Sequence, residues 1–210
     1  ARVEHTDYSS MGPEASHGDS FTHVLPSAHA NIDLRQDLKL RLSASSAISR
    51  PTYNEWRASA LINAAEQQVS GGNPSLKPEE AWGLDASLEW YYGDASLLSA
   101  GVFTRRIQDV IYADSTTVDG GLYLPEAAGQ SWSYTGFVNG KDGRLQGVEL
   151  NLIAQADDVV PGLLDGFGAD ANVTLLDSRF DTLGGNRFGL PGTSDLIFNS
   201  SVYYETDNLS

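Results

Sequence analysis

Strict alternation of apolar and polar residues is the feature of this sequence that most limits its fold. In WGLDASLEWYY at 82–92, every second residue from Trp82 is apolar or aromatic, and the residues between include Asp85 and Glu89. Successive side chains of a strand point to opposite faces, so the pattern predicts a β-strand with one apolar and one polar face. The same alternation predicts strands in 24–34, 38–46, 146–155, 167–176 and 196–205, and less regularly in 1–11 and 96–112.

These segments give about eight strands, each of roughly the 9–11 residues that a tilted strand needs to cross a bilayer. Their connections differ in length. Gln36-Asp37 and Gly93-Asp94 fit tight hairpin turns. Long links rich in Gly, Ser, Asn and Pro occupy 12–19, 57–78 and 114–131. Short turns at one end and long loops at the other are typical of bacterial outer-membrane barrels.

Two segments do not fit this pattern of strands, short turns and long loops. The composition of 57–68, RASALINAAEQQ, predicts a short helix inside a long loop. The segment 157–166, DDVVPGLLDG, falls where the alternation of short and long connections predicts a short turn, but it is longer than a tight turn. We therefore expect it to form a small apolar knob at the barrel rim.

Charge and composition exclude several classes of protein. The formal net charge of −15 argues against a nucleic-acid partner, because binding phosphates requires clustered Lys and Arg. The absence of cysteine removes disulfides, thiolate metal sites and cysteine nucleophiles. Both ends fall beside strand-like patterns, so we expect a fragment of a longer protein.

A sheet with one face buried in a soluble β-sandwich would also alternate, so the period alone leaves two interpretations. Full charges in the middle of strands favour a barrel with a water-filled or plug-facing lumen. Aromatic residues near strand ends, such as Trp90 and Tyr204, fit the girdles found at membrane interfaces. We therefore predict lumen-facing side chains at Arg41, Asp85, Glu89, Glu149 and Asp170 and lipid-facing side chains at Leu84, Leu88, Leu150, Leu152, Val173 and Leu175.

Residues 72–111, GNPSLKPEEAWGLDASLEWYYGDASLLSAGVFTRRIQDVI, resemble the barrel signature of TonB-dependent outer-membrane receptors. Three further pieces agree in order and spacing, at 24–53, 143–155 and 190–210. The resemblance implies an all-β, antiparallel, up-and-down transmembrane barrel of about 22 strands with a plugged lumen. Residues 1–210 would form part of this barrel domain, and the plug domain and the C-terminal strands would be absent.

The resemblance also implies a function in the outer membrane of a Gram-negative bacterium. The intact receptor would take up a nutrient ligand, such as a carbohydrate, an iron chelate or a vitamin. Its partners would be this ligand, outer-membrane lipid and lipopolysaccharide, and the TonB complex through the absent plug; no cofactor is implied. Two alternatives remain open, a passive porin-like or adhesin-like barrel and a soluble carbohydrate-binding β-sandwich.

No residue pattern predicts an enzyme or a metal site. His17, Asp19 and His23, with His5, lack a recognised ligand spacing, and the serines near His29 are explained by the abundance of serine on polar faces. Arg106 falls where the apolar band should end, which fits either a snorkelling side chain or a contact with lipopolysaccharide phosphates. Candidate ligand-stacking residues in the long loops are Tyr53, Trp56, Tyr123, Trp132 and Tyr134.

Overall fold

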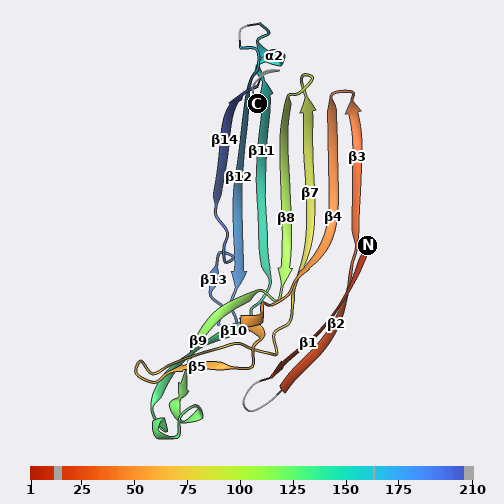
Figure 1. Ribbon diagram of the computed structural model, residues 1–210. Helices are drawn as coiled ribbons and strands as arrows, with labels where there is room; N and C mark the ends of the chain where they lie inside the picture. The colour runs from red at the N-terminus through yellow and green to blue at the C-terminus, as the bar shows by residue number, and fades with distance from the viewer. Residues whose placement is uncertain (12–15, 163, 206–210) are drawn as a thin grey trace.

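The computed structural model describes residues 1–11, 16–162 and 164–205, and in them the chain forms three separate β-sheets (Figure 1). The large sheet has eight strands in the order β13-β12-β11-β8-β7-β4-β3, with β14 also paired to β12. Its strands are β3 (Ser27–Arg35), β4 (Leu38–Ser49), β7 (Glu79–Tyr91), β8 (Leu97–Gln108), β11 (Gly143–Gln155), β12 (Phe167–Asp181), β13 (Arg187–Phe188) and β14 (Leu196–Tyr204). All pairings within the large sheet are antiparallel, as predicted.

Short connections gather at one end of the large sheet, which we call the turn end, at the top of Figure 1. The predicted turns at Gln36-Asp37 and Gly93-Asp94 are confirmed between β3 and β4 and between β7 and β8. The third connection, between β11 and β12, begins with the one-turn helix α2 (Ala156–Val159). Val159, Val160 and Leu164 in this connection are exposed, so the predicted apolar knob is present.

The opposite end, the loop end, carries two smaller sheets (Figure 1). The small sheet has the order β5-β6-β10-β9. The hairpin sheet pairs β1 with β2 only, so the predicted strand at 1–11 lies outside the large sheet. The bounds are β1 (Arg2–Met11), β2 (Ser16–Leu25), β5 (Ala60–Asn63), β6 (Gln68–Gly71), β9 (Ile111–Asp119) and β10 (Ser131–Asn139). Short helices at this end are α1 (Tyr53–Trp56), η1 (Gly120–Leu122) and η2 (Pro125–Ala127).

The predicted helix at 57–68 is wrong, because residues in this segment form β5 and the turn that leads into β6. Pairing of β6 with both β5 and β10 satisfies its backbone groups and overrides the helical composition. Strands also replace much of the loops predicted at 12–19 and 114–131: β2 includes 16–19, β9 includes 114–119, and 12–15 lie outside the described residues.

The register of the large sheet sorts its side chains onto two faces, because directly paired residues of neighbouring strands point to the same side. One continuous row is Leu40, Leu88, Ala100, Leu150, Val173 and Phe198. The same face, here called the apolar face, carries Leu84, Leu152 and Leu175. The opposite, polar face carries Arg41, Asp85, Glu89, Glu149 and Asp170.

The apolar face has no protein cover among the described residues. Leu84 exposes 59% and Leu150 exposes 47% of its surface, and no second sheet packs against them. A β-sandwich would bury this face, so the structure does not support the sandwich interpretation. In the part of the chain that the structure describes, no helix has the length and apolar character required to cross a membrane.

Candidate functional surfaces

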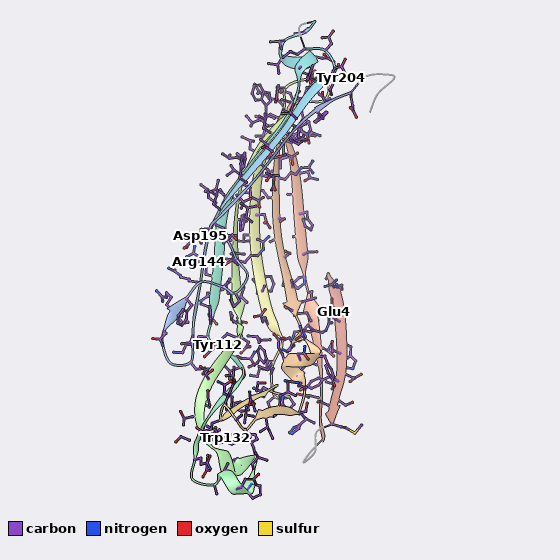
Figure 2. All side chains as sticks on the ribbon, turned by 60° about the vertical axis from the view of Figure 1, so that its left-hand side comes forward. Glu4, Tyr112, Trp132, Arg144, Asp195 and Tyr204 are labelled. Carbon is purple, nitrogen blue, oxygen red and sulfur yellow. The ribbon has the colours of Figure 1, made fainter. Side chains whose placement is uncertain are left out.

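Aromatic side chains border the apolar face at its turn end. Trp90 and Tyr92 lie with ring centroids 5.3 Å apart, and Phe167 and Tyr204 lie 4.7 Å apart. Figure 2 labels Tyr204 close to this end of the sheet. The Trp90 indole N–H donates to Asp37 Oδ2 at 3.0 Å, so its polar edge points toward the turn. An apolar ring with a hydrogen-bonded edge is the arrangement that aromatic belts use at membrane surfaces.

Trp82 lies at the other border of the apolar face, eight residues from Trp90 on the same strand. Eight residues of strand span about 27 Å, or about 20 Å along the barrel axis at a tilt of about 40°. Outer-membrane barrels present an apolar band about 25 Å tall between their aromatic girdles. The height of the apolar face therefore matches that of a hydrocarbon layer.

Paired charges cover the polar face. The Arg105 guanidinium lies 2.6 Å from Asp85 Oδ1, and the Ser43 hydroxyl donates to Asp85 Oδ2 at 2.8 Å. Closer to the turn end, Arg41 donates to Glu89 at 2.7 Å. Gly83 leaves room for this arrangement, because a Cβ there would come within 2.6 Å of the Arg105 side chain. Half-exposed ion pairs of this kind add only about 0–1 kcal/mol each, so the polar face is suited to water rather than to a dry core.

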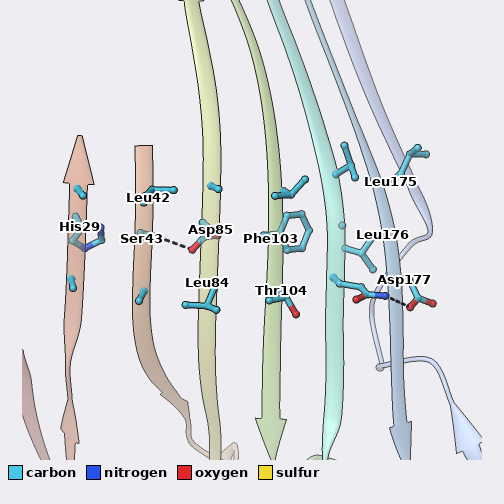
Figure 3. Close-up of a pocket in the computed structure, with 18 of the residues that line it drawn as sticks. His29, Leu42, Ser43, Leu84, Asp85, Phe103, Thr104, Leu175, Leu176 and Asp177 are labelled. Atoms are coloured by element: carbon cyan, nitrogen blue, oxygen red, sulfur yellow. Dashed lines mark hydrogen bonds between the residues drawn. The ribbon is translucent and has the colours of Figure 1, made fainter. Parts of the chain in front are cut away.

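A shallow depression crosses the middle of the large sheet and is shown in Figure 3. Its two acidic side chains in the close-up already accept hydrogen bonds. Asp85, on the polar face, accepts from the Ser43 hydroxyl, and Asp177, on the apolar face, accepts from Gln146 Nε2 at 3.0 Å. The rest of the lining is mainly apolar, with Phe103 near its centre. The depression therefore offers few polar groups that could recognise a small polar ligand.

The small sheet has a dry core of its own. Val69, Ala127 and Trp132 are buried there, with Val118, Tyr123, Leu124 and Tyr134 packed around them. Gly120 lets the Trp132 ring lie flat on the backbone, because a Cβ at Gly120 would come within 2.5 Å of the indole nitrogen. At the tip, Asp119 Oδ1 accepts from the backbone N–H groups of Gly121 and Gly129, which lowers the pKa of Asp119.

A second aromatic cluster fastens the hairpin sheet to the loop that follows β4. Tyr8 and Trp56 stack with centroids 4.1 Å apart and planes 6° from parallel, and Phe21 lies 6.0 Å from Trp56. The Tyr8 hydroxyl donates to the Pro74 carbonyl at 2.6 Å, and the Trp56 N–H donates to the Leu76 carbonyl at 2.9 Å. Burial is the main cause of the raised pKa of Tyr8, and the charge of Asp19 contributes.

The five predicted ligand-stacking aromatics occupy three different environments. Tyr53 is 81% exposed on α1, whereas Trp132 is only 2% exposed and lies inside the small sheet. Trp56 is stacked on Tyr8, and Tyr123 is stacked on Tyr134 at 6.2 Å. Only Tyr53 thus offers a largely free ring, and the structure does not gather the five into one site.

Sequence reasoning missed a carboxylate that joins two neighbouring turns. Asp158 of α2 accepts from the backbone N–H groups of Asp94 and Ala95 and from the Ser96 hydroxyl at 2.6 Å. These bonds, led by that of Ser96, lower the pKa of Asp158. Ser96, only 2% exposed, also accepts from Gln155 N–H. The signal in the sequence was the acidic pair Asp157-Asp158 at the start of 157–166.

The histidines do not converge on a metal site. His23 Nε2 lies 2.9 Å from Glu80, and His5 Nε2 lies 3.2 Å from Asp7, in separate pairs. Within residues 1–11, 16–162 and 164–205, no three His, Cys, Asp or Glu side chains are grouped so that they could hold a metal ion.

Comparisons with known proteins agree with this architecture. A family model described as "TonB dependent receptor-like, beta-barrel" matches residues 1–210. No curated protein matches the sequence. The ferric enterobactin receptor PfeA from Pseudomonas aeruginosa superposes with a TM-score of 0.66 at 19% identity, covering 91% of this chain and 27% of that chain.

Two further structures show the same fold. The siderophore receptor PirA from Acinetobacter baumannii matches with a TM-score of 0.60 at 17% identity, covering 91% of this chain and 28% of that one. The copper transporter OprC matches with a TM-score of 0.57 at 20% identity, covering 91% and 25%. The chain therefore spans about a quarter of the length of the solved structures that it resembles.

Proposed function

The chain belongs to the family of TonB-dependent receptor-like β-barrels, and on that premise we propose that the intact protein imports a nutrient ligand across the outer membrane of a Gram-negative bacterium. Members of this family are transporters, not enzymes, so no catalytic group is assigned. The observation that carries the proposal is the sorting of side chains across the centre of the large sheet, from β4 to β12, where the rows that contain Val148, Leu150 and Leu152 are uncharged and the charged side chains lie on the polar face. An uncovered apolar face opposite a charged face supports a barrel wall with lipid on one side and water on the other.

Residues 1–210 supply part of the barrel wall in this proposal. Among the described residues, β3 is paired only with β4 at one side of the large sheet, and β13 and β14 are paired only with β12 at the other, so neighbouring strands of the barrel would pair at these two sides. The apolar face would contact lipid, and the polar face would line the lumen against a plug domain. Energy would reach the receptor from the TonB complex through that plug.

Ligand contact is assigned to the loop end, because the turn end would face the periplasm. Tyr53 offers a free ring there, and Tyr123 lies at the tip of the small sheet. Trp56, Trp132 and Tyr134 would support the same surface from beneath by holding the loops in place. The solved relatives include receptors for siderophores and a copper transporter, so metal complexes are the first ligand class to test.

The test is uptake by cells that express the full-length protein, supplied with radiolabelled ferric siderophores, copper, cobalamin or oligosaccharides. The proposal predicts concentrative uptake of one ligand that is lost on deletion of the tonB gene. Uptake that persists without TonB would instead show a passive barrel. Calorimetry on the purified full-length receptor in detergent would then measure how far Tyr53→Ala weakens binding of that ligand, with the remote apolar-face variant Leu152→Val as the control.

A further inference from the structure

Three arginines from three neighbouring strands stand side by side in the large sheet. The register pairs Arg144 of β11 directly with Arg106 of β8 on one side and with Arg179 of β12 on the other. Directly paired Cα atoms are about 4.5–5.5 Å apart, so the three side chains leave the sheet next to one another on the same face. The row lies on the apolar face, because Val102, Val148 and Leu175 are directly paired in the same phase.

Carboxylates neutralise this row only in part. Arg106 has one ion pair at 3.6 Å, to Asp142, and both side chains are mostly exposed. Asp181 is engaged by Arg187 at 2.8 Å, and Asp177 accepts from Gln146. Among the described residues, no carboxylate oxygen lies within ion-pair distance of Arg144 or Arg179.

Such a row is costly unless an anion lies across it, because like charges directly opposite one another destabilise a sheet. The chain has 13 Lys and Arg against 28 Asp and Glu, so the clustering is not a product of a generally basic surface. The outer ends of β8, β11 and β12 also enclose a depression beside β13. It is lined by Arg105, Arg106, Arg144, Arg179 and Arg187 and also by Asp142 and Asp181.

The position of the row identifies the anion. Trp82 of β7 is paired directly with Arg106, so the row continues the aromatic border of the apolar face. One row closer to the turn end the side chains are Thr104, Gln146 and Asp177, and beyond them the face is apolar. A phosphate group of a lipid in the outer leaflet would lie at this height, beside the apolar face.

We propose that Arg106, Arg144 and Arg179 bind the phosphate groups of lipopolysaccharide in the outer leaflet. The planar guanidinium group of arginine binds phosphate through paired, charge-assisted hydrogen bonds. The three arginines lie on three neighbouring strands, so they could contact more than one phosphate group. The acyl chains would lie on Val102, Val148 and Leu175. This inference rests on the membrane placement in the proposed function but not on transport, because the site lies on the face away from the lumen.

The experiment uses the full-length protein purified in detergent and titrated with bisphosphorylated lipid A in the presence of EDTA. The triple variant Arg106→Gln/Arg144→Gln/Arg179→Gln is expected to bind at least about tenfold more weakly, because each charge-assisted hydrogen bond to phosphate is strong. Dephosphorylated lipid A should bind wild type and variant equally. The matched control, Arg35→Gln/Lys39→Gln/Arg41→Gln, removes three charges near the turn end and should bind like wild type.

Equal binding of lipid A by wild type and triple variant would overturn the proposal, as would binding that disappears with EDTA, since that requires a bridging cation. Migration of unheated protein on gels reports whether each variant is folded. If the triple variant does not fold, the single variant Arg144→Gln is titrated in its place. Binding of lipid A by the wild type is then also measured at rising salt concentration, where it should weaken. Loss of uptake with lipid binding intact would contradict only the proposed function.

Discussion

Leu84 and Val102 in the large sheet expose 59% and 55% of their surface, whereas Val69 and Trp132 in the small sheet each expose 2%. The large sheet leaves the apolar side chains of one face exposed, whereas the small sheet encloses a core around Val69 and Trp132. The difference follows from the surroundings proposed for each. In the proposed membrane, lipid would cover the apolar side chains of the large sheet, so this sheet needs no protein core. The small sheet would be surrounded by water, so it must bury apolar side chains in a core of its own.

Figure 2 shows the two situations in one view, with Trp132 near the loop end and the large sheet as a single curved layer bearing side chains on both sides. The described residues that are both apolar and buried are Leu25, Val69, Leu76, Val110, Ala127, Trp132 and Phe180. None of them belongs to the central rows of the large sheet. The comparison therefore predicts that the two sheets respond to different substitutions.

The largest effect is expected from Trp132→Ala, which empties the core of the small sheet. Loss of a buried Trp costs about 3–5 kcal/mol, which exceeds what a sheet of this size can spare. Limited proteolysis of the full-length receptor should then cut within 112–139, while unheated gel migration shows an intact barrel. Unfolding of the barrel together with the small sheet would refute their independence. Tyr53→Ala, exposed at the same end, is the control.

Leu150→Arg tests the other half of the comparison. An arginine on the lipid side near the bilayer centre costs about 2–4 kcal/mol, so less receptor should assemble in the outer membrane. The control is Glu149→Arg, one residue away on the polar face, where water is available to the charge. Quantifying folded receptor in membrane fractions measures both variants. Equal loss from the two would show that the faces do not differ in their surroundings.

The two sheets also differ in how well the sequence predicts them. Alternation in 82–92 and 146–155 reports the surroundings of each residue directly, so strands, faces and turns could be predicted locally. The small sheet depends instead on the parallel pairing of 68–70 with 133–135. That pairing joins distant segments, and Ala-rich composition at 57–68 pointed to a helix. The alternating Trp132, Tyr134 and Gly136 were the available signal for β10.

A smaller effect is expected for the hairpin sheet with Tyr8→Phe. The substitution keeps the stack on Trp56 and removes the hydrogen bond to the Pro74 carbonyl, which is worth about 0.5–1.5 kcal/mol. Hydrogen exchange in β1 and β2 of the full-length protein should accelerate, with no change in β7. Acceleration that extends to β7 would mean that the cluster also stabilises the large sheet.

The smallest effect concerns the turn end and appears only in acid. The Ser96 hydroxyl and two backbone N–H groups hold the pKa of Asp158 below the unfolded value near 3.9. Their contribution is complete above about pH 4 and is lost as the pH falls through the lower folded-state pKa. Amide exchange at Asp94 and Ala95 should therefore rise in that window. In the Asp158→Asn variant, the amides of Asp94 and Ala95 should exchange faster at neutral pH, and their exchange should show no further rise in acid. A rise in the wild type that is centred above about pH 5 would contradict the role of Asp158.

The parallel pairing of β6 with β10 has a mechanical consequence. It joins the connection between β4 and β7 to the connection between β8 and β11, although the two leave the large sheet at different places. The connection between β8 and β11 leaves the large sheet at Asp109, whose φ is 56°, and returns at Gly140, whose N–H donates to the Val110 carbonyl. The two connections therefore form one unit, and a displacement of either tip would be transmitted to the other through this pairing.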